Sequence, residues 1–153
     1  MQMSIRKGVM IALASGLVFA PAFAVSADIV KSRIDSYREL GAAFKAVNDG
    51  LRGGDVQAVL IAQSARQIRN AAKAQYQLFP AGSGPRAGLK TNAKAEIWTK
   101  PKPFRAAQDA FSVAADRFFA AATKGSPATI RAEAAKLGAT CKACHDQFRS
   151  KVD

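Results

Sequence analysis

Apolar side chains recur every three or four residues in four segments of this chain, and Gly, Pro and Ser residues separate the segments. This period is typical of amphipathic α-helices. It predicts helices over about residues 28–51, 56–78 and 127–149, and a further helix from about residue 103 to a stop at Gly125. Ala, Lys, Arg, Glu and Gln predominate in these segments and favour helix over strand. We therefore expect an all-α fold.

The segments also contain residues that start helices and residues that face a core. Asp28 and Asp55 are expected to cap the first two helices, and Ser126 followed by Pro127 is expected to start the last one. The periodic positions are expected to be buried. They are Ile29, Arg33, Tyr37, Leu40, Phe44 and Val47 in the first helix, Leu60, Ile61, Ile68, Ala72 and Tyr76 in the second, and Phe104, Ala107, Phe111, Ala115 and Phe118 in the third.

The lengths of the connections predict how the helices are arranged. The chain of 153 residues allows one domain. Short connections after the first and third helices predict two antiparallel hairpins, which together form an antiparallel four-helix bundle. The segment between Pro80 and Lys102 shows no period, and loops of that length usually carry a site or cross the bundle.

The first residues of the chain have the features of a secretory signal peptide. Arg6 and Lys7 precede an apolar stretch from Val9 to Ala20. The alternative is a membrane anchor, but the stretch is shorter than the roughly 20 residues that a spanning helix needs.

The predicted cleavage site follows this apolar stretch. Ala22-Phe23-Ala24 fits the cleavage pattern, and Val25-Ser26-Ala27 offers a later site. We therefore expect residues 1–24 to be removed, with cleavage as late as residue 27 as the alternative, and residues 25–153 to form the bundle. The mature protein would lie in the periplasm without a membrane span.

Composition excludes several other classes of protein. Hydrophobic residues make up 49% of the chain and charged residues 22%, which excludes a disordered or acidic solvating chain. Two cysteines are too few for a scaffold built on disulfides.

The two cysteines and the single histidine stand together in the sequence Cys141-Lys142-Ala143-Cys144-His145. This spacing is typical of covalent haem c attachment. Thiols at positions i and i+3 lie on one face of a helical turn, so both can add to the vinyl groups of one porphyrin. His145 is then placed to bind the iron. We therefore predict one haem c, attached through Cys141 and Cys144, with His145 as the axial iron ligand.

Other interpretations of this motif explain less. A redox dithiol of the thioredoxin type needs a preceding strand, and none is predicted. A structural zinc site needs four ligands, and the chain has three of the usual nitrogen and sulfur type. An ordinary disulfide leaves the adjacent histidine unexplained.

The place of the motif on the last predicted helix differs from that in class I cytochromes, which carry it near the N-terminus. Together with the segments Tyr37–Phe44, Glu96–Trp98 and Cys141–Arg149, it resembles the cytochrome c′ family, the class II cytochromes c. The resemblance covers essentially the whole mature chain. It implies a four-helix bundle with one covalent haem c and electron transfer as the usual role.

The sixth coordination position of the iron is constrained by composition. The three methionines, Met1, Met3 and Met10, lie in the predicted signal peptide, and the chain has no second histidine. Lysine or tyrosine could ligate instead, but both have a high pKa and stay protonated near neutral pH. We therefore expect a five-coordinate, high-spin iron with an apolar distal face.

The resemblance also implies roles for residues outside the motif. Arg33 takes the position that contacts a haem propionate, Tyr37 the position that covers the distal face, and Asn92 a loop position at the haem edge. Arg149, one turn after His145, takes a basic position on the proximal side. The alternatives are a solvated surface for Arg33, a core aromatic for Tyr37 and a favourable charge at a helix C-terminus for Arg149.

These residues predict two functions. The first is a one-electron carrier in the periplasm, and the alternative is a module that binds or scavenges nitric oxide or carbon monoxide. Catalysis has little support because the chain has no distal histidine, so we expect no enzyme. The formal net charge is +12, which favours an acidic redox partner, or no specific partner, over a nucleic acid in an exported protein.

The second helix predicts self-association. Val56, Val59, Leu60 and Ile61 place apolar side chains on more than one face. Class II bundles commonly pair through their first two helices, so we expect a homodimer, with a monomer as the alternative.

Overall fold

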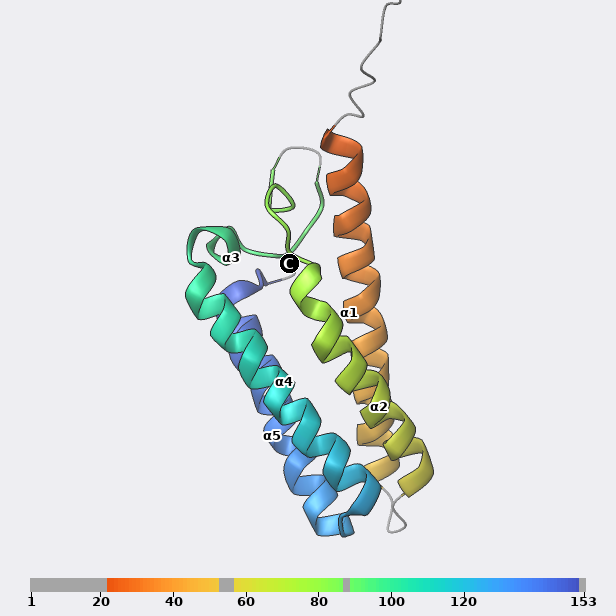
Figure 1. Cartoon of the computed structure of the whole chain (residues 1–153). Helices are drawn as coiled ribbons and strands as arrows, with labels where there is room; N and C mark the ends of the chain where they lie inside the picture. The colour runs from red at the N-terminus through yellow and green to blue at the C-terminus, as the bar shows by residue number, and fades with distance from the viewer. Residues whose placement is uncertain (1–21, 53–56, 87–88, 152–153) are drawn as a thin grey trace, which may run out of the picture.

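The computed structural model describes residues 22–52, 57–86 and 89–151. Four long helices are α1 (Ala22–Arg52), α2 (Ala58–Ala74), α4 (Pro101–Lys124) and α5 (Pro127–Phe148). A 3₁₀ turn, Gln75–Gln77, follows α2, and the short helix α3 (Glu96–Thr99) precedes α4. Helix α1 packs along α2, α2 along α4, and α4 along α5 (Figure 1). The predicted all-α four-helix bundle is confirmed.

The ends of the first two long helices differ from the prediction. Helix α1 begins at Ala22, so Asp28 lies inside the helix and does not cap it. The Ala-rich segment before Asp28 continues the helical pattern back to Pro21 because alanine has the highest helix propensity. Helix α2 begins at Ala58, after Gln57, which makes no side-chain cap. The predicted cap Asp55 lies outside the described residues.

The start of α5 follows the prediction. The Ser126 hydroxyl accepts a hydrogen bond from the backbone N–H of Thr129 (3.2 Å), and Pro127 occupies the first helical turn. Pro also begins α4, at Pro101 rather than near Pro103, since neither proline removes a needed hydrogen bond in the first turn. The short helix α3 was not predicted, because four residues are too few to show a helical period.

The bundle core contains buried residues from all four long helices. The helices approach closely because many of these side chains are alanine. The core consists of Ala43, Val47, Ile61, Ala65, Ile68, Ala72, Phe111, Ala114, Ala115, Phe118, Ala122, Ile130, Ala134 and Leu137. The prediction for Leu60 was wrong, as its side chain is 52% exposed. Its neighbour Ile61 takes the inward position, and the turn of about 100° between adjacent helical residues points the larger part of Leu60 to solvent.

A second cluster lies at the other end of the bundle, and we call it the aromatic cluster. It contains Ile97, Phe104 and Phe148, with Phe79 and Trp98 packed against them. Its rings meet edge to face: Phe104 lies 4.7 Å from Phe79 and 5.1 Å from Phe148 between ring centroids. This cluster joins the long loop to the start of α4 and the end of α5.

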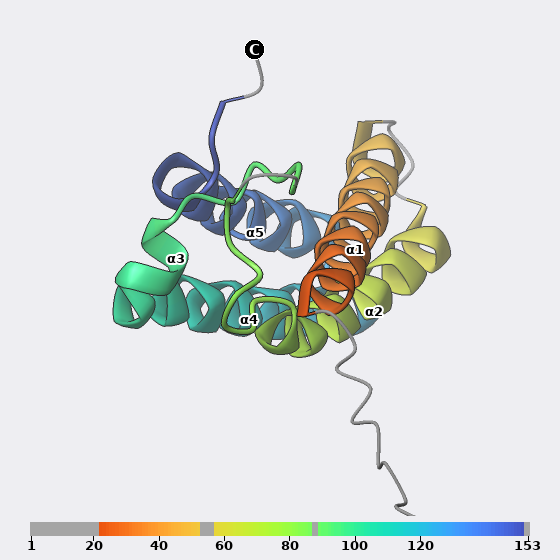
Figure 2. The same ribbon diagram turned by 90° about the horizontal axis from the view of Figure 1, so that it is seen from above.

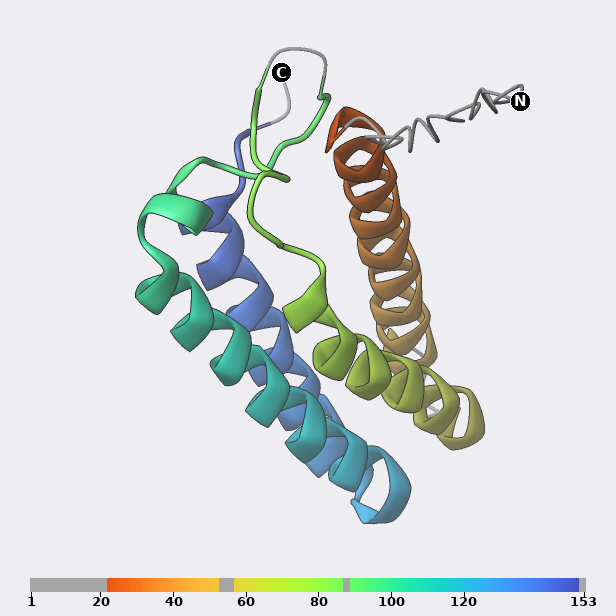
Figure 3. The same ribbon diagram turned by 45° about the horizontal axis from the view of Figure 1, so that its top comes forward.

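Helices α1 and α5 meet near the middle of α5 and then separate. A Cβ atom on Gly138 would lie 3.2 Å from Cζ of Phe44, so glycine admits this ring of α1 against α5. Beyond Gly138 the C-terminal half of α5 diverges from α1, and the long loop lies at that end of the bundle (Figures 2 and 3). Within the part of the chain that the structure describes, no helix has the length and hydropathy needed to cross a membrane.

Candidate haem site

The residues of the predicted haem motif lie on the last two turns of α5. Cys141 and Cys144 are half-buried free thiols, and His145 beside them is exposed. Cys141 packs against the bundle core, whereas Cys144 packs against the aromatic cluster. The two thiols therefore occupy one face of α5, at the boundary between the two apolar clusters, where a flat apolar ring could contact both.

The ionisation of these groups fits haem attachment better than redox chemistry. Burial raises the pKa of Cys144 to about 11, and it also raises the pKa of Cys141. A redox dithiol needs a lowered pKa on its attacking thiol, so these protonated thiols do not fit that chemistry. Partial burial lowers the pKa of His145, and the positive charge of Arg149 lowers it further. A neutral imidazole keeps a lone pair for iron, so the donor set fits a covalently bound haem.

Tyr37 of α1 lies close to the two cysteines. Burial raises the pKa of its phenol above the ordinary value, and the nearby Cys144 and Cys141 side chains raise it further. Its ring meets Phe79 edge to face, with centroids 6.1 Å apart. The fold therefore brings together Tyr37 and the cysteine pair, which are about a hundred residues apart in the sequence.

Arg33, one turn before Tyr37, is buried, with 3% of its surface exposed. The alternative of a solvated surface residue was therefore wrong. Its guanidinium donates hydrogen bonds to four oxygens of the long loop. These are the carbonyl of Leu78 (3.2 Å), the hydroxyl and carbonyl of Ser83 (3.1 and 2.9 Å), and the hydroxyl of Thr91 (3.2 Å).

Two aromatic rings complete the surroundings of Arg33. Its Cζ lies 4.9 Å from the centroid of Phe79 and 5.5 Å from that of Trp98. The partners of the guanidinium within the protein are thus neutral oxygens and ring faces. Desolvation lowers the pKa of Arg33, but a guanidinium stays charged in proteins. Arg33 thus attaches the loop to α1.

The same loop is fastened to the end of α5 by backbone hydrogen bonds. Lys94 N–H donates to the carbonyl of Phe148 (2.9 Å), and Ser150 N–H donates to the carbonyl of Asn92 (2.8 Å). Between them, Ala93 and Arg149 form an antiparallel bridge. The Asn92 residue itself is exposed, so its backbone makes the contact that the structure describes.

Pairing with the loop also ends α5 one residue earlier than expected. Arg149 has extended dihedrals (φ −117°, ψ 130°). The prediction that the helix includes Arg149, one turn after His145, was therefore wrong. Its N–H still donates to the carbonyl of His145 (3.0 Å). The exposed Arg149 therefore keeps its charge near the imidazole by capping α5.

Several residues of this region were missed from the sequence. Ser83, Thr91 and Phe79 lie in a segment without a period, so no local pattern identified them as partners of Arg33. Phe148 could have been found, because it is the apolar residue one turn after Cys144. Trp98 lies against Gly84, where a Cβ atom would approach its ring to 3.0 Å.

A helical bundle with Cys-x-x-Cys-His on its last helix defines the class of c-type cytochromes with C-terminal haem attachment. The family model for cytochrome c′ matches residues 28–149. The chain therefore belongs to the cytochrome c′ family, and its cofactor is covalently bound haem c.

Individual relatives agree with this assignment. A cytochrome c′ from Rubrivivax gelatinosus is 40% identical over 70 residues, which are 46% of this chain and 54% of that protein. The alignment thus spans about half of that relative. A cytochrome c′ from Pararhodospirillum photometricum is 35% identical over 78% of this chain and 94% of its own length.

Solved structures share the fold. The crystal structure of cytochrome c′ from Rubrivivax gelatinosus matches with a TM-score of 0.75 at 28% identity, covering 82% of this chain and 97% of that one. A nitric oxide complex of a cytochrome c′ variant from Alcaligenes xylosoxidans has a TM-score of 0.75 at 26% identity, covering 83% and 97% of the two chains.

Proposed function

We propose that this cytochrome c′ is a periplasmic one-electron carrier with a five-coordinate haem. Cys141 and Cys144 would bind the haem as thioethers, and His145 would be its axial ligand. The haem iron, when bound, supplies the Fe(III)/Fe(II) couple. The free thiols at the boundary of the two apolar clusters and the neutral imidazole beside them support this assignment.

One observation carries the proposal of an open sixth position. After Met10 the sequence contains no methionine, and His145 is its one histidine. The side chain near the cysteines on α1 is Tyr37, whose buried phenol has a raised pKa and stays protonated at neutral pH. A protonated phenol is a poor iron ligand, so the chain offers no strong sixth donor near Tyr37.

Other residues would orient the haem rather than ligate it. We propose that Arg33 contacts a propionate in addition to its loop partners, and that Tyr37 covers the distal face. Asn92 would lie at the haem edge and Arg149 on the proximal side. The position of Arg33 beside Tyr37, and that of Arg149 beside His145, support these roles.

A second candidate function is the binding of nitric oxide or carbon monoxide. It is favoured by the same lack of a strong sixth donor and by the apolar side chains Leu40 and Phe44 near Tyr37. It is also favoured by the related Alcaligenes protein, a variant of which forms a nitric oxide complex.

Optical and electron paramagnetic resonance spectra of the purified protein test these proposals. We expect a high-spin ferric spectrum at neutral pH, a reversible one-electron couple, and binding of nitric oxide to the reduced protein. A low-spin ferric spectrum would show that a side chain occupies the sixth position and would remove the basis for gas binding. Absence of a reversible couple would contradict the carrier function.

Tyr37 variants separate the two ways in which this residue could act. If Tyr37 restricts space, Tyr37→Ala should speed nitric oxide association, because the pocket becomes larger. If the phenol ligates instead, the ferric spectrum should contain a tyrosinate charge-transfer band that Tyr37→Phe removes. We expect the first result.

The proposed location follows from the predicted signal peptide, which falls mostly outside the described residues. We propose cleavage after Ala24, or as late as Ala27, and a periplasmic mature protein. Fractionation of the expressing cells and N-terminal sequencing of the haem-containing protein test this. A mature N-terminus before Phe23, or haem protein confined to the cytoplasm, would contradict it.

We also propose that the protein forms a homodimer through α1 and α2. Val59 and Leu60 on α2 are 73% and 52% exposed, which supports an apolar contact surface. Ile61 is fully buried and belongs to the bundle core instead. In sedimentation, Leu60→Asp should give monomers. Val113→Asp, at an exposed apolar residue of α4, should leave the dimer intact.

A further inference from the structure

The positive charge of this protein is concentrated in two segments. Residues 86–105 and 142–151 contain nine Lys and Arg residues and two carboxylates, a net charge of +7. The other residues from position 25 onward carry only +3. Less than a quarter of the mature chain therefore carries most of its net charge.

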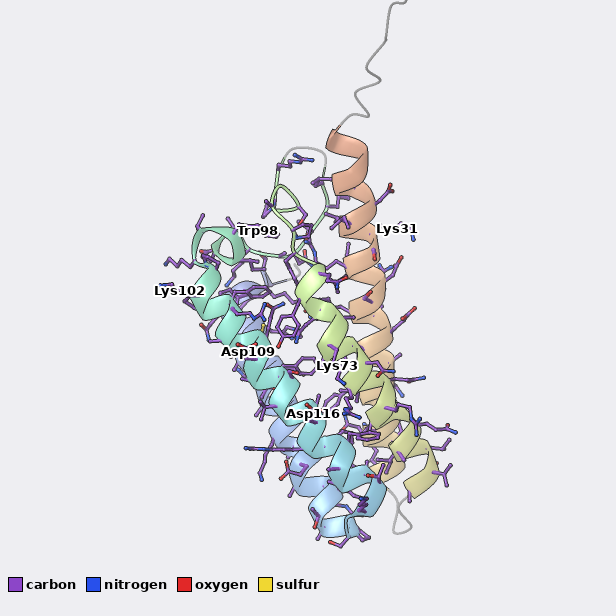
Figure 4. All side chains as sticks on the ribbon, viewed as in Figure 1. Lys31, Lys73, Trp98, Lys102, Asp109 and Asp116 are labelled. Carbon is purple, nitrogen blue, oxygen red and sulfur yellow. The ribbon has the colours of Figure 1, made fainter. Side chains whose placement is uncertain are left out.

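The fold brings these two segments together at one end of the molecule. The Ala93–Arg149 bridge joins them, and Lys94 Nζ donates to the carbonyl of Asp146 (3.2 Å). Phe104 packs on Phe148, so the start of α4 lies beside the end of α5. Figure 4 shows Lys102 pointing outward from this start of α4, near Trp98. We call this surface the basic end; it comprises Lys94, Lys100, Lys102, Lys142, Arg149 and Lys151.

Of these six side chains, all but Lys142, which is paired with Asp146, are available to a partner. Five of them are exposed, and Lys94 is half-buried. One of the two carboxylates, that of Asp146, is already paired with Lys142 (2.6 Å). Two members of the basic end, Lys142 and Arg149, flank Cys144 and His145, the residues that the proposed function places at the haem.

Helix α1 shows the opposite arrangement of charge. There Asp35 pairs with Lys31 and Arg38, and Asp49 pairs with Lys45 and Arg52. Together with the exposed Asp28 and Glu39, these two carboxylates balance the four cations on the exposed face of α1. The charge asymmetry therefore follows the position of the haem motif.

We propose that the basic end is the docking surface for an acidic electron-transfer protein. This inference rests on the proposed carrier function. A positive surface attracts a carboxylate-rich partner, orients it before contact and raises the association rate. Docking at the end of α5 would bring such a partner close to His145, the residue that would ligate the haem iron.

Two other occupants fit the surface less well. An anionic membrane would also attract the charge, but peripheral membrane binding usually combines basic residues with apolar side chains that insert. Among the described residues, the large exposed apolar side chains are Val59, Leu60 and Val113, which lie on α2 and α4 outside the basic end. A second copy of the chain would place like charges against each other.

The test compares two variants that change the net charge equally. The basic-end variant carries Lys100→Glu, Lys102→Glu and Lys151→Glu. The control variant carries Arg66→Glu, Lys73→Glu and Lys124→Glu, at exposed positions of α2 and α4. Glutamate is well tolerated near the start of α4 because it complements the helix dipole. Haem content and circular dichroism verify that both variants fold.

The first measurement uses flavodoxin, an acidic redox protein, as the probe. Its apoprotein, which transfers no electrons, is titrated calorimetrically into the haem-loaded cytochrome at low ionic strength. We expect the basic-end variant to bind at least about tenfold more weakly than the control variant. Binding should also weaken between about 10 and 500 mM ionic strength, over which the Debye length falls from about 30 Å to a few ångströms.

The second measurement is the rate at which the reduced protein passes one electron to a small oxidant. Hexacyanoferrate(III) is a trianion and becomes hexacyanoferrate(II), whereas tris(phenanthroline)cobalt(III) is a trication and becomes the cobalt(II) complex. In the basic-end variant the rate with the anion should fall about tenfold relative to the control variant, and the rate with the cation should rise.

Three results would overturn the proposal. Equal effects in the two variants would show that only total charge matters. Unchanged flavodoxin binding would exclude the basic end as a protein-docking surface. Loss of binding to phosphatidylglycerol vesicles in the basic-end variant, with flavodoxin binding unchanged, would assign the surface to a membrane. Failure of the unmodified protein to exchange electrons with either oxidant would instead contradict the carrier function.

Discussion

The bundle core and the haem end of the molecule are stabilised in different ways. In the bundle core, apolar side chains from four helices, many of them small or branched, interdigitate at regular helical spacing. At the haem end, one buried arginine, a few backbone hydrogen bonds and five aromatic rings connect segments that are far apart in the sequence. A region that must accommodate a large flat ligand cannot close on itself through continuous aliphatic packing. At this end the long loop instead makes directional contacts with Arg33 and with the end of α5.

Two buried side-chain amides, those of Gln75 and Gln108, lie at the boundary between the bundle core and the haem end. Gln75 Nε2 donates to the carbonyls of Ala72 and Gln108, and Gln108 Nε2 donates back to the carbonyl of Gln75. Ala72 belongs to the bundle core, whereas Phe104, one turn before Gln108, belongs to the aromatic cluster. In the described part of the chain no buried side-chain nitrogen or oxygen lacks a hydrogen-bond partner.

The largest expected effect is a complete loss at the haem end that leaves the bundle core folded. Replacing both Cys141 and Cys144 by Ala should abolish covalent haem attachment, because no thioether can form. Acid acetone should then extract all haem from the variant and none from the unmodified protein. Helical circular dichroism should remain, since Cys141 lies at the edge of the bundle core and alanine keeps that position apolar. Extractable haem in the unmodified protein would contradict the assignment of these cysteines.

A truncation in the bundle core should cost the most stability. Phe118 is fully buried, so Phe118→Ala should lower the free energy of unfolding by about 3–5 kcal/mol. Phe79→Ala in the aromatic cluster should cost less, because that ring is only half-buried. Denaturant titrations of the haem-loaded proteins measure both values. An equal or larger loss from Phe79→Ala would contradict the comparison.

Arg33→Lys should weaken the haem end without disturbing the bundle core. Lysine keeps the charge, but one ammonium group cannot reach the four oxygens or stack as guanidinium does. We expect a loss of about 1–3 kcal/mol in the free energy of unfolding. Amide hydrogen exchange should accelerate at Ser83 and at residues 91–94. Unchanged exchange in the loop would show that Arg33 does not attach it.

The smallest expected effect is a dependence of stability on alkaline pH. Burial raises the pKa of Tyr37 in the folded protein, so above about pH 10 the unfolded chain releases this proton first. The protonated Tyr37 phenol makes its full contribution to stability below about pH 10. Above that pH the free energy of unfolding decreases by at most about 1.4 kcal/mol per pH unit. Burial still raises the pKa of Tyr37 after the cysteines have formed uncharged thioethers.

Unfolding of the haem-loaded Tyr37→Phe variant as a function of pH measures this contribution. The alkaline loss of stability should be smaller in Tyr37→Phe than in the unmodified protein. Tyr76→Phe serves as the matched control. Burial and a hydrogen bond to Asp109 also raise the pKa of Tyr76, but this residue lies on the α2 side of the bundle, against α4. An identical pH profile for Tyr37→Phe and the unmodified protein would show that the Tyr37 phenol ionises normally.

Local patterns in the sequence determined the helices and the chemistry of the haem motif. A helical period depends on neighbours three and four residues away, so the four long helices and the Ser126 cap could be predicted. The spacing of Cys141, Cys144 and His145 likewise places them at positions i, i+3 and i+4 of one helix, whatever the rest of the chain does. The sequence also contains no methionine after Met10 and no second histidine, so neither could supply an iron ligand after that position.

Tertiary structure alone decided which partners meet across the bundle. Arg33 binds oxygens 45 to 58 residues away, and Arg149 leaves the helix because its backbone pairs with Ala93. Whether Leu60 or Ile61 faces inward depended on the rotation of α2 against α4. The gathering of basic residues at one end likewise required α4 and the loop to lie beside the end of α5. Such contacts join distant parts of the chain, and their formation depends on helix placement, which no local period encodes.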